Sequence, residues 1–121
     1  MKAVLALFLL LVIASCTTTG SPARSKLVGN WRYSDAIQSC HYSFNADGSF
    51  SGEVTRGGKL VLKFAGQWKM EKHAILYVYL SETRGRIPRG TTDRDQLIEL
   101  EEDSFVIQAA NGERRRYVRG S

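Results

Sequence analysis

The sequence predicts an all-β protein, a small up-and-down antiparallel β-barrel of about eight strands that follows an apolar N-terminal segment and a short flexible tether. From residue 27 onward, short runs of β-branched and aromatic residues are separated by turn signals about every 8 to 12 residues. The same region lacks the spacing of apolar residues that is typical of a helix. A closed barrel is favoured over an open sheet because closure removes exposed strand edges.

The predicted barrel domain spans residues 27–121, so roughly 95 residues share one core. A domain of that size buries only about 60 to 65% of its unfolded surface. We therefore expect any ligand site to be a cleft or a shallow cup rather than a large internal cavity.

Each strand is predicted from an apolar or alternating run that ends at a turn signal. Asp47-Gly48 and Asn111-Gly112 are strong signals, because these residues tolerate the positive φ that tight hairpins need. Gly66 predicts a bend or bulge inside one long run, and residues 81–95 are predicted to form a long loop. The predicted strands cover residues 27–33, 40–45, 49–56, 59–65 with 67–70, 74–80, 96–101, 104–109 and 114–119.

Alternation along the strands predicts which side chains share a face. Ile98 and Leu100 are predicted to point inward, with Glu99 on the opposite face. Both faces of 74–80 are apolar, so this strand either lies between two layers or exposes a tyrosine stripe. The other inward positions are predicted to be Cys40, Tyr42, Phe44, Phe50, Gly52, Val54, Leu60, Leu62, Phe64, Gly66, Trp68 and Met70.

The N-terminal stretch has the composition of an export signal. Lys2 precedes an apolar run over residues 3–14, and small residues then lead to Cys16. The run is shorter than the roughly 20 apolar residues that span a bilayer. Ile13-Ala14-Ser15-Cys16 resembles the cleavage site of bacterial prolipoprotein signal peptides at all four positions. The resemblance implies a signal peptide over residues 1–15 and a lipid on Cys16, with a transmembrane anchor or an ordinary secretory peptide as alternatives.

By the same resemblance, the mature chain would begin with lipidated Cys16 and a flexible tether over residues 16–26. Lipoproteins of Gram-negative bacteria that carry Asp after the cysteine are commonly retained in the inner membrane. Thr17 therefore implies the periplasmic face of the outer membrane, if the source has two membranes. A lipid anchor would make the membrane itself the first partner of this protein.

The charge and the cysteines narrow the expected partners. Removing Lys2 from 17 basic and 12 acidic residues leaves 16 minus 12, a net charge of +4. That excess suits acidic envelope components, or it serves solubility alone. Nucleic acid is not an expected partner of an exported protein. With Cys16 lipidated, Cys40 has no partner for an intramolecular disulfide.

Three short motifs give the domain a family resemblance. Gly29-Asn30-Trp31 is similar to the Gly-x-Trp motif that opens lipocalins, and Gly66-Gln67-Trp68 repeats its spacing. The run Tyr42-x-Phe44-x-x-Asp47-Gly48-x-Phe50 resembles a hairpin of small bacterial lipocalin-like domains. The resemblance implies that Trp31 closes one end of a barrel and that Arg119 or Arg116 stacks on it. The alternative is that Trp31 and Trp68 are plain core residues.

No catalytic, cofactor or metal constellation is visible, so we expect a binding protein rather than an enzyme. His41 and His73 lie on separate strands, and Cys40 points away from His41. The resemblance implies a small amphiphilic or apolar ligand in a cup lined by Tyr42, Phe44, Phe50, Leu62, Phe64 and Trp68. The arginines predicted to contact an anionic group or a partner are Arg84, Arg86, Arg89 and Arg115. The alternative is a protein-interaction or inhibitor module of the envelope with a solid barrel.

Overall fold

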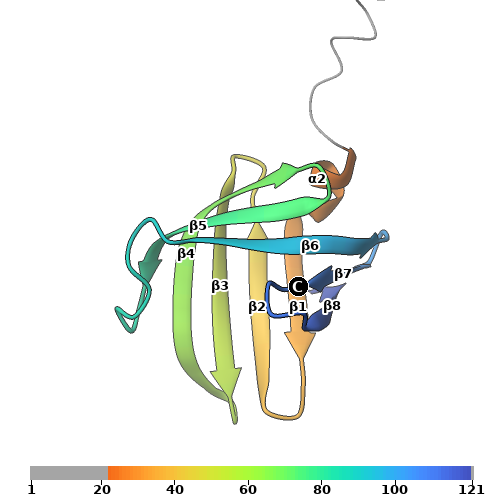
Figure 1. Ribbon diagram of the computed structural model, residues 1–121. Helices are drawn as coiled ribbons and strands as arrows, with labels where there is room; N and C mark the ends of the chain where they lie inside the picture. The colour runs from red at the N-terminus through yellow and green to blue at the C-terminus, as the bar shows by residue number, and fades with distance from the viewer. Residues whose placement is uncertain (1–21, 121) are drawn as a thin grey trace, which may run out of the picture.

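Eight antiparallel strands close into a barrel in sequence order, and β8 pairs back onto β1 (Figure 1). The computed structural model describes residues 22–120, so Cys16 and the predicted signal peptide lie outside the described residues. The predicted all-β class and the up-and-down barrel are confirmed. The strands are β1 (Gly29–Ser34), β2 (Gln38–Phe44), β3 (Ser49–Arg56), β4 (Lys59–Glu71), β5 (Ala74–Glu82), β6 (Thr92–Leu100), β7 (Ser104–Gln108) and β8 (Arg114–Arg119).

A short helix, α2 (Pro22–Leu27), lies where the sequence predicted the end of the tether and the first strand residue. Leu27 is fully buried in the barrel core, and the Arg24 guanidinium carbon lies 4.9 Å from the centroid of the Trp68 ring. Pro22 at the first helical position was the available signal, but six residues are too few to show a helical period. Residues 22–27 are therefore part of the folded domain. Within residues 22–120, no helix is long and apolar enough to cross a membrane.

The fourth strand runs through Gly66, and the predicted irregularity there is confirmed. The pairing of β4 with β5 shifts register between Ala65 and Gly66. A Cβ at Gly66 would collide with the carbonyl oxygen of Val78, so a side chain does not fit at this close approach. The long loop is shorter than predicted, since β5 continues to Glu82 and β6 already begins at Thr92.

Register shifts also explain where the inward pattern departs from the prediction. Cys40 pairs with Val54, and Phe44 with Phe50, as alternation predicts. Leu60 instead is 51% exposed, because β3 and β4 shift register between Val54 and Thr55 and place it opposite Thr55.

The second departure is on β6. Ile98 is 37% exposed, because a bulge between Leu97 and Glu99 interrupts the alternation. Leu97 packs against the core in place of Ile98, and Leu100 points inward as predicted. On β5 the tyrosines point inward, and Leu76 and Val78 form the outer apolar stripe.

Trp31 closes the end of the barrel that carries α2. Its side chain is fully buried, its Nε1 donates to the Leu27 carbonyl at 2.7 Å, and its ring meets Phe105 edge to face at 4.7 Å between centroids. The Arg119 guanidinium carbon lies 4.1 Å from the centroid of the Trp31 ring. Of the two arginines predicted for this role, Arg119 takes it, while Arg116 faces Glu99 at 3.7 Å on the outside.

Arg119 also ties three segments together. Its guanidinium donates to the carbonyls of Lys26, Val28 and Glu102 at 2.9 to 3.2 Å. Gly29 has a φ of 134°, and a Cβ there would lie 2.5 Å from Arg119 Nη1, so only glycine leaves room for this packing.

We expect Arg119→Lys to lower the free energy of unfolding by about 1 to 2 kcal/mol, because lysine lacks the planar fork that both stacks and donates to several carbonyls. Urea unfolding monitored by tryptophan fluorescence checks this. Arg114→Lys on the same strand is the matched control, since Arg114 bonds only to the exposed Gln108 side chain. Equal stability of the two variants would contradict the assigned role of Arg119.

Candidate functional site

The end of the barrel opposite α2 contains a polar cavity of about 320 Å³, which we call the tyrosine cup. It lies inside the barrel between β2, β5, β6 and the last hairpin. Its lining consists of aromatic rings, two carboxylates, an amide and a guanidinium. The lining residues are Tyr42, Tyr77, Tyr79, Asp93, Asp95, Ala109, Ala110, Asn111 and Arg115.

All five tyrosines of the sequence pack into this half of the barrel. Tyr42 lies 6.5 Å from Tyr77 and 5.5 Å from Tyr117 between ring centroids, and Tyr33 lies 5.7 Å from Tyr117. Tyr79 rests against Phe50 at 5.8 Å. A tyrosine buries its ring and keeps a polar tip, so this layer separates the apolar core from the cup.

Two aspartates of β6 face the cup. Asp95 pairs with Ile75 and Asp93 with Tyr77 across the β5–β6 ladder, which places both aspartates on the inner face. Burial raises the pKa of the Asp95 carboxyl to about 6, although a hydrogen bond from the Tyr77 hydroxyl opposes the rise and Asp93 adds to it. Burial and the two carboxylates raise the pKa of Tyr79 to about 12. Asp95 is thus a partly buried acid whose pKa lies well above that of an ordinary aspartate.

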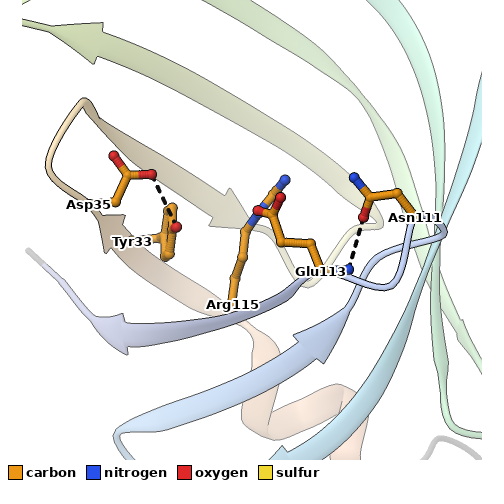
Figure 2. Close-up of polar contacts among 5 residues, drawn as sticks. All are labelled: Tyr33, Asp35, Asn111, Glu113 and Arg115. Atoms are coloured by element: carbon orange, nitrogen blue, oxygen red, sulfur yellow. Dashed lines mark hydrogen bonds and ion pairs between the residues drawn. The ribbon is translucent and has the colours of Figure 1, made fainter.

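Arg115 lies on β8, close to Tyr33 of the neighbouring strand β1 (Figure 2), and its side chain lines the cup. These strands share only two register pairs, Trp31 with Arg119 and Arg32 with Val118. Beyond them, the Arg115 guanidinium carbon lies 5.8 Å from the centroid of the Tyr33 ring.

A chain of polar contacts surrounds this guanidinium (Figure 2). Arg115 Nε donates to the Glu113 carboxylate at 2.7 Å, and the Glu113 N–H donates to Asn111 Oδ1 at 2.9 Å. The Tyr33 hydroxyl donates to Asp35 at 3.2 Å. Partial burial opposes the charge of Arg115, but hydrogen bonds with Glu113 and Tyr117 raise its pKa above the ordinary value. Arg115 is therefore a fixed, paired cation at the rim.

Most of the side chains predicted to line a ligand cup fill the barrel below the cup. Tyr42 lines the cup itself. Phe44, Phe50, Phe64 and Trp68 are between 1% and 6% exposed and pack against one another, for example with Phe44 and Trp68 at 4.9 Å between centroids. The predicted Leu62 is half-buried against this core. The structure brings these residues together, but as a packed aromatic layer.

The predicted basic residues do not gather in one place. Arg84, Arg86 and Arg89 are exposed in the β5–β6 loop, at the left of the barrel in Figure 1, whereas Arg115 is on β8, which pairs with β7 and β1. The Glu82 carboxylate organises the loop by accepting the backbone N–H groups of Arg84, Arg86 and Ile87. Arg89 Nη1 donates to the Leu80 carbonyl at 3.1 Å.

Sequence reasoning missed Asp93 and Asp95, because it placed residues 81–95 in a loop. The available signal was the alternation of Asp93, Asp95 and Leu97, which extends the inward face of β6 back toward its start. Charged residues at inward positions hide that pattern, since an inward face is normally recognised by its apolar residues.

Other hollows lie on the outside of the sheet. One of about 490 Å³ follows the outer face of β3, β4 and β5, and another of about 580 Å³ lies along β5 and β6. The exposed ion pair of Glu53 and Lys63 borders the first hollow, with 3.6 Å between its charged atoms. Among residues 22–120, no group of three or more His, Cys, Asp or Glu side chains is placed to hold a metal ion.

The fold has a counterpart among solved structures. A crystal structure of a lipocalin-like protein from Bacteroides uniformis superposes on this chain with a TM-score of 0.60 and 18% sequence identity, covering 78% of this chain and 99% of the other. No protein-family model matches the sequence, and no curated protein matches it. The predicted lipocalin-like barrel is thereby confirmed at the level of the fold.

We expect Asp95→Asn to stabilise the protein at pH 7.5 and to have little effect at pH 3.5. An acid whose pKa rises from 3.8 to about 6 on folding binds its proton more tightly in the folded state. The ionised carboxylate therefore costs stability above pH 6, and this cost disappears as the pH falls from about 6 to 3.8.

A rise of two pKa units corresponds to roughly 3 kcal/mol, and solvent screening of this partly exposed group reduces the expected gain to about 1 to 2 kcal/mol. Thermal unfolding at the two pH values measures the effect. Asp103→Asn, on the exposed turn before β7, is the control. A lower melting temperature for Asp95→Asn at pH 7.5 would contradict the prediction.

Cys40 is the one free cysteine among the described residues, and it is buried. Burial raises the pKa of its thiol, so little of the reactive thiolate forms at neutral pH. We expect a disulfide-exchange reagent to label Cys40 far more slowly in the folded chain than in urea. Rapid labelling of the folded protein would show that the Cys40 thiol is accessible and would contradict the prediction that it is unreactive.

Proposed function

We propose that this protein is a lipid-anchored bacterial envelope lipoprotein whose barrel binds a small ligand in the tyrosine cup. In this proposal the protein binds and does not catalyse. The observation that supports it is the cup itself, a polar cavity inside one end of a barrel that is otherwise filled. Lipocalin-like folds place ligands in the mouth of the barrel, which is a general site for ligands in β-barrels.

The size of the cup limits the ligand. About 320 Å³ is near the lower end of the range for small-molecule sites, roughly 300 to 1,000 Å³. The aromatic layer of Phe44, Phe50, Phe64 and Trp68 leaves no depth for a long acyl chain. A small amphiphile with one compact apolar part and one polar group fits best, with the rings contacting the first part and the carboxylates or Asn111 the second.

The proposal of a lipid anchor is supported by the resemblance of Ile13-Ala14-Ser15-Cys16 to the cleavage site of prolipoprotein signal peptides. An attached diacylglyceryl group would hold the domain on the periplasmic face of a membrane, the outer one by the resemblance at Thr17. We expect the full chain to be recovered with membranes when expressed in a Gram-negative host, and a Cys16→Ser chain to leave the membrane fraction. Equal distribution of the two chains would contradict lipidation of Cys16.

A second function is favoured by the outer face of β5. Leu76 and Val78 are half-buried there and border a hollow of about 210 Å³ together with Lys69. An apolar stripe beside a cation suits an acidic protein partner. In this alternative the protein is an interaction module of the envelope, and the cup is incidental.

Native mass spectrometry of the full chain, purified without denaturation from a bacterial envelope, tests whether the tyrosine cup holds a small ligand. We expect a small species in stoichiometric amount and its loss from Ala110→Trp, because Ala110 borders the cup and is exposed enough to accept a larger side chain. Ala46→Trp at the opposite end is the matched control. A clean apo mass together with capture of an envelope protein would favour the interaction module.

A further inference from the structure

The tyrosine cup has the opposite charge from the chain as a whole. The sequence carries a net charge of +5, yet Asp93 and Asp95 both face the cup. The cation at its rim, Arg115, is already paired with Glu113 at 2.7 Å. Within residues 22–120, neither aspartate forms an ion pair with a lysine or arginine. The cup therefore holds negative charge that no neighbouring side chain fully balances.

The walls around this charge are aromatic. Tyr42, Tyr77 and Tyr79 line the same cavity as the two aspartates. The face of a tyrosine ring attracts a cation, and the attraction grows when the site is screened from water. Carboxylates and tyrosine rings in one small cavity are complementary to a positively charged organic group.

Two tyrosine hydroxyls in the cup differ in their partners. The Tyr77 hydroxyl donates to Asp95. Tyr42 is half-buried and borders the cup, and its hydroxyl has no hydrogen-bond partner among residues 22–120. No buried side-chain oxygen among the described residues lacks a hydrogen-bond partner, so the Tyr42 hydroxyl reaches the solvent in the cup and is open to a polar group on a ligand.

Two other ligand classes fit this lining less well. Calcium takes six to eight oxygen ligands, and only two carboxylates are available here, between rings. An anion at Arg115 would meet a guanidinium whose charge Glu113 already partly balances, and it would lie next to Asp93 and Asp95. The cup therefore offers an anion less favourable electrostatics than it offers an organic cation.

We propose that the tyrosine cup selects small organic ammonium ions, with Asp95 and Asp93 facing the charge and Tyr42, Tyr77 and Tyr79 enclosing the alkyl groups around it. This inference rests on the proposed function, because it names the class of ligand for the same cavity. The proposal concerns binding and involves no chemical step.

Choline and its neutral isostere, in which a quaternary carbon replaces the nitrogen, have the same shape and differ in charge. Comparing their affinities therefore shows how much the positive charge contributes to binding. A carboxylate of similar size serves as the anionic probe. Isothermal titration of the full chain in phosphate buffer, without amine buffers that would compete, should show choline bound at least about tenfold more tightly than either analogue. The N-methyl protons of choline should shift upfield in NMR spectra, because they would lie against tyrosine rings.

Variants then test which residues of the cup contribute to choline binding. Asp95→Asn should weaken choline binding by about tenfold or more and should leave the neutral isostere unaffected, while Asp103→Asn on the exposed turn should change neither. Tyr42→Phe should weaken binding of the hydroxyl-bearing probes and keep the preference for charge. Tighter binding of the neutral or anionic probe, or an unchanged affinity in Asp95→Asn, would overturn the proposal.

The possible failures are distinguishable. If the neutral or anionic probe binds and Ala110→Trp abolishes that binding, the cup is a ligand site and only the preference for cations is wrong. If none of the three probes binds and no species co-purifies with the chain, both the inference and the proposed ligand function are wrong. Choline binding that survives both Ala110→Trp and Asp95→Asn would place the cation outside the cup and overturn the inference.

Discussion

The packing of Trp31 against Arg119 is the interaction on which the rest of the structure depends. The fully buried indole fixes the start of β1, donates to the end of α2, and supports the guanidinium that reaches the carbonyls of Lys26, Val28 and Glu102. The last strand is thereby held to the first at the point where their ladder is only two pairs long. The backbone adds a hydrogen bond from the Gly120 N–H to the Asn30 carbonyl there, and the remaining part of the seam relies on side chains such as Tyr33 and Tyr117.

The packing that closes the barrel at the α2 end leaves space for a cavity at the opposite end. Eight strands enclose a space that side chains nearly fill, and here phenylalanine and tryptophan fill it from the closed end as far as Phe50 and Phe64. Only the final layer consists of tyrosines, whose hydroxyls allow polar side chains to sit above them. The cup exists because its floor is amphipathic, and Asp95 is tolerated at its wall because Tyr77 donates to it.

Much of this fold was predictable from residue patterns, and the candidate site was predictable only in part. Turn signals such as Asp47-Gly48 and the alternation through Tyr42 and Phe44 are local, so they identified hairpins and faces correctly. Ile98 was assigned to the wrong face because a bulge is a property of two paired strands and leaves no mark in one of them. The two aspartates that line the cup were missed for a related reason. Asp93 and Asp95 resemble loop residues until the pairing with β5 shows which way they point.

Helix α2 has a consequence for the direction from which a ligand arrives. It lies at one end of the barrel (Figure 1), and the residues that line the tyrosine cup lie toward the other end. Only residues 17–21 separate α2 from Cys16. Five residues span at most about 18 Å when fully extended. If Cys16 carries the lipid, the closed end is therefore held near the bilayer and the cup opens away from it. A solute would enter from the aqueous compartment, and the anchor would serve to fix position and orientation rather than to deliver lipid to the barrel.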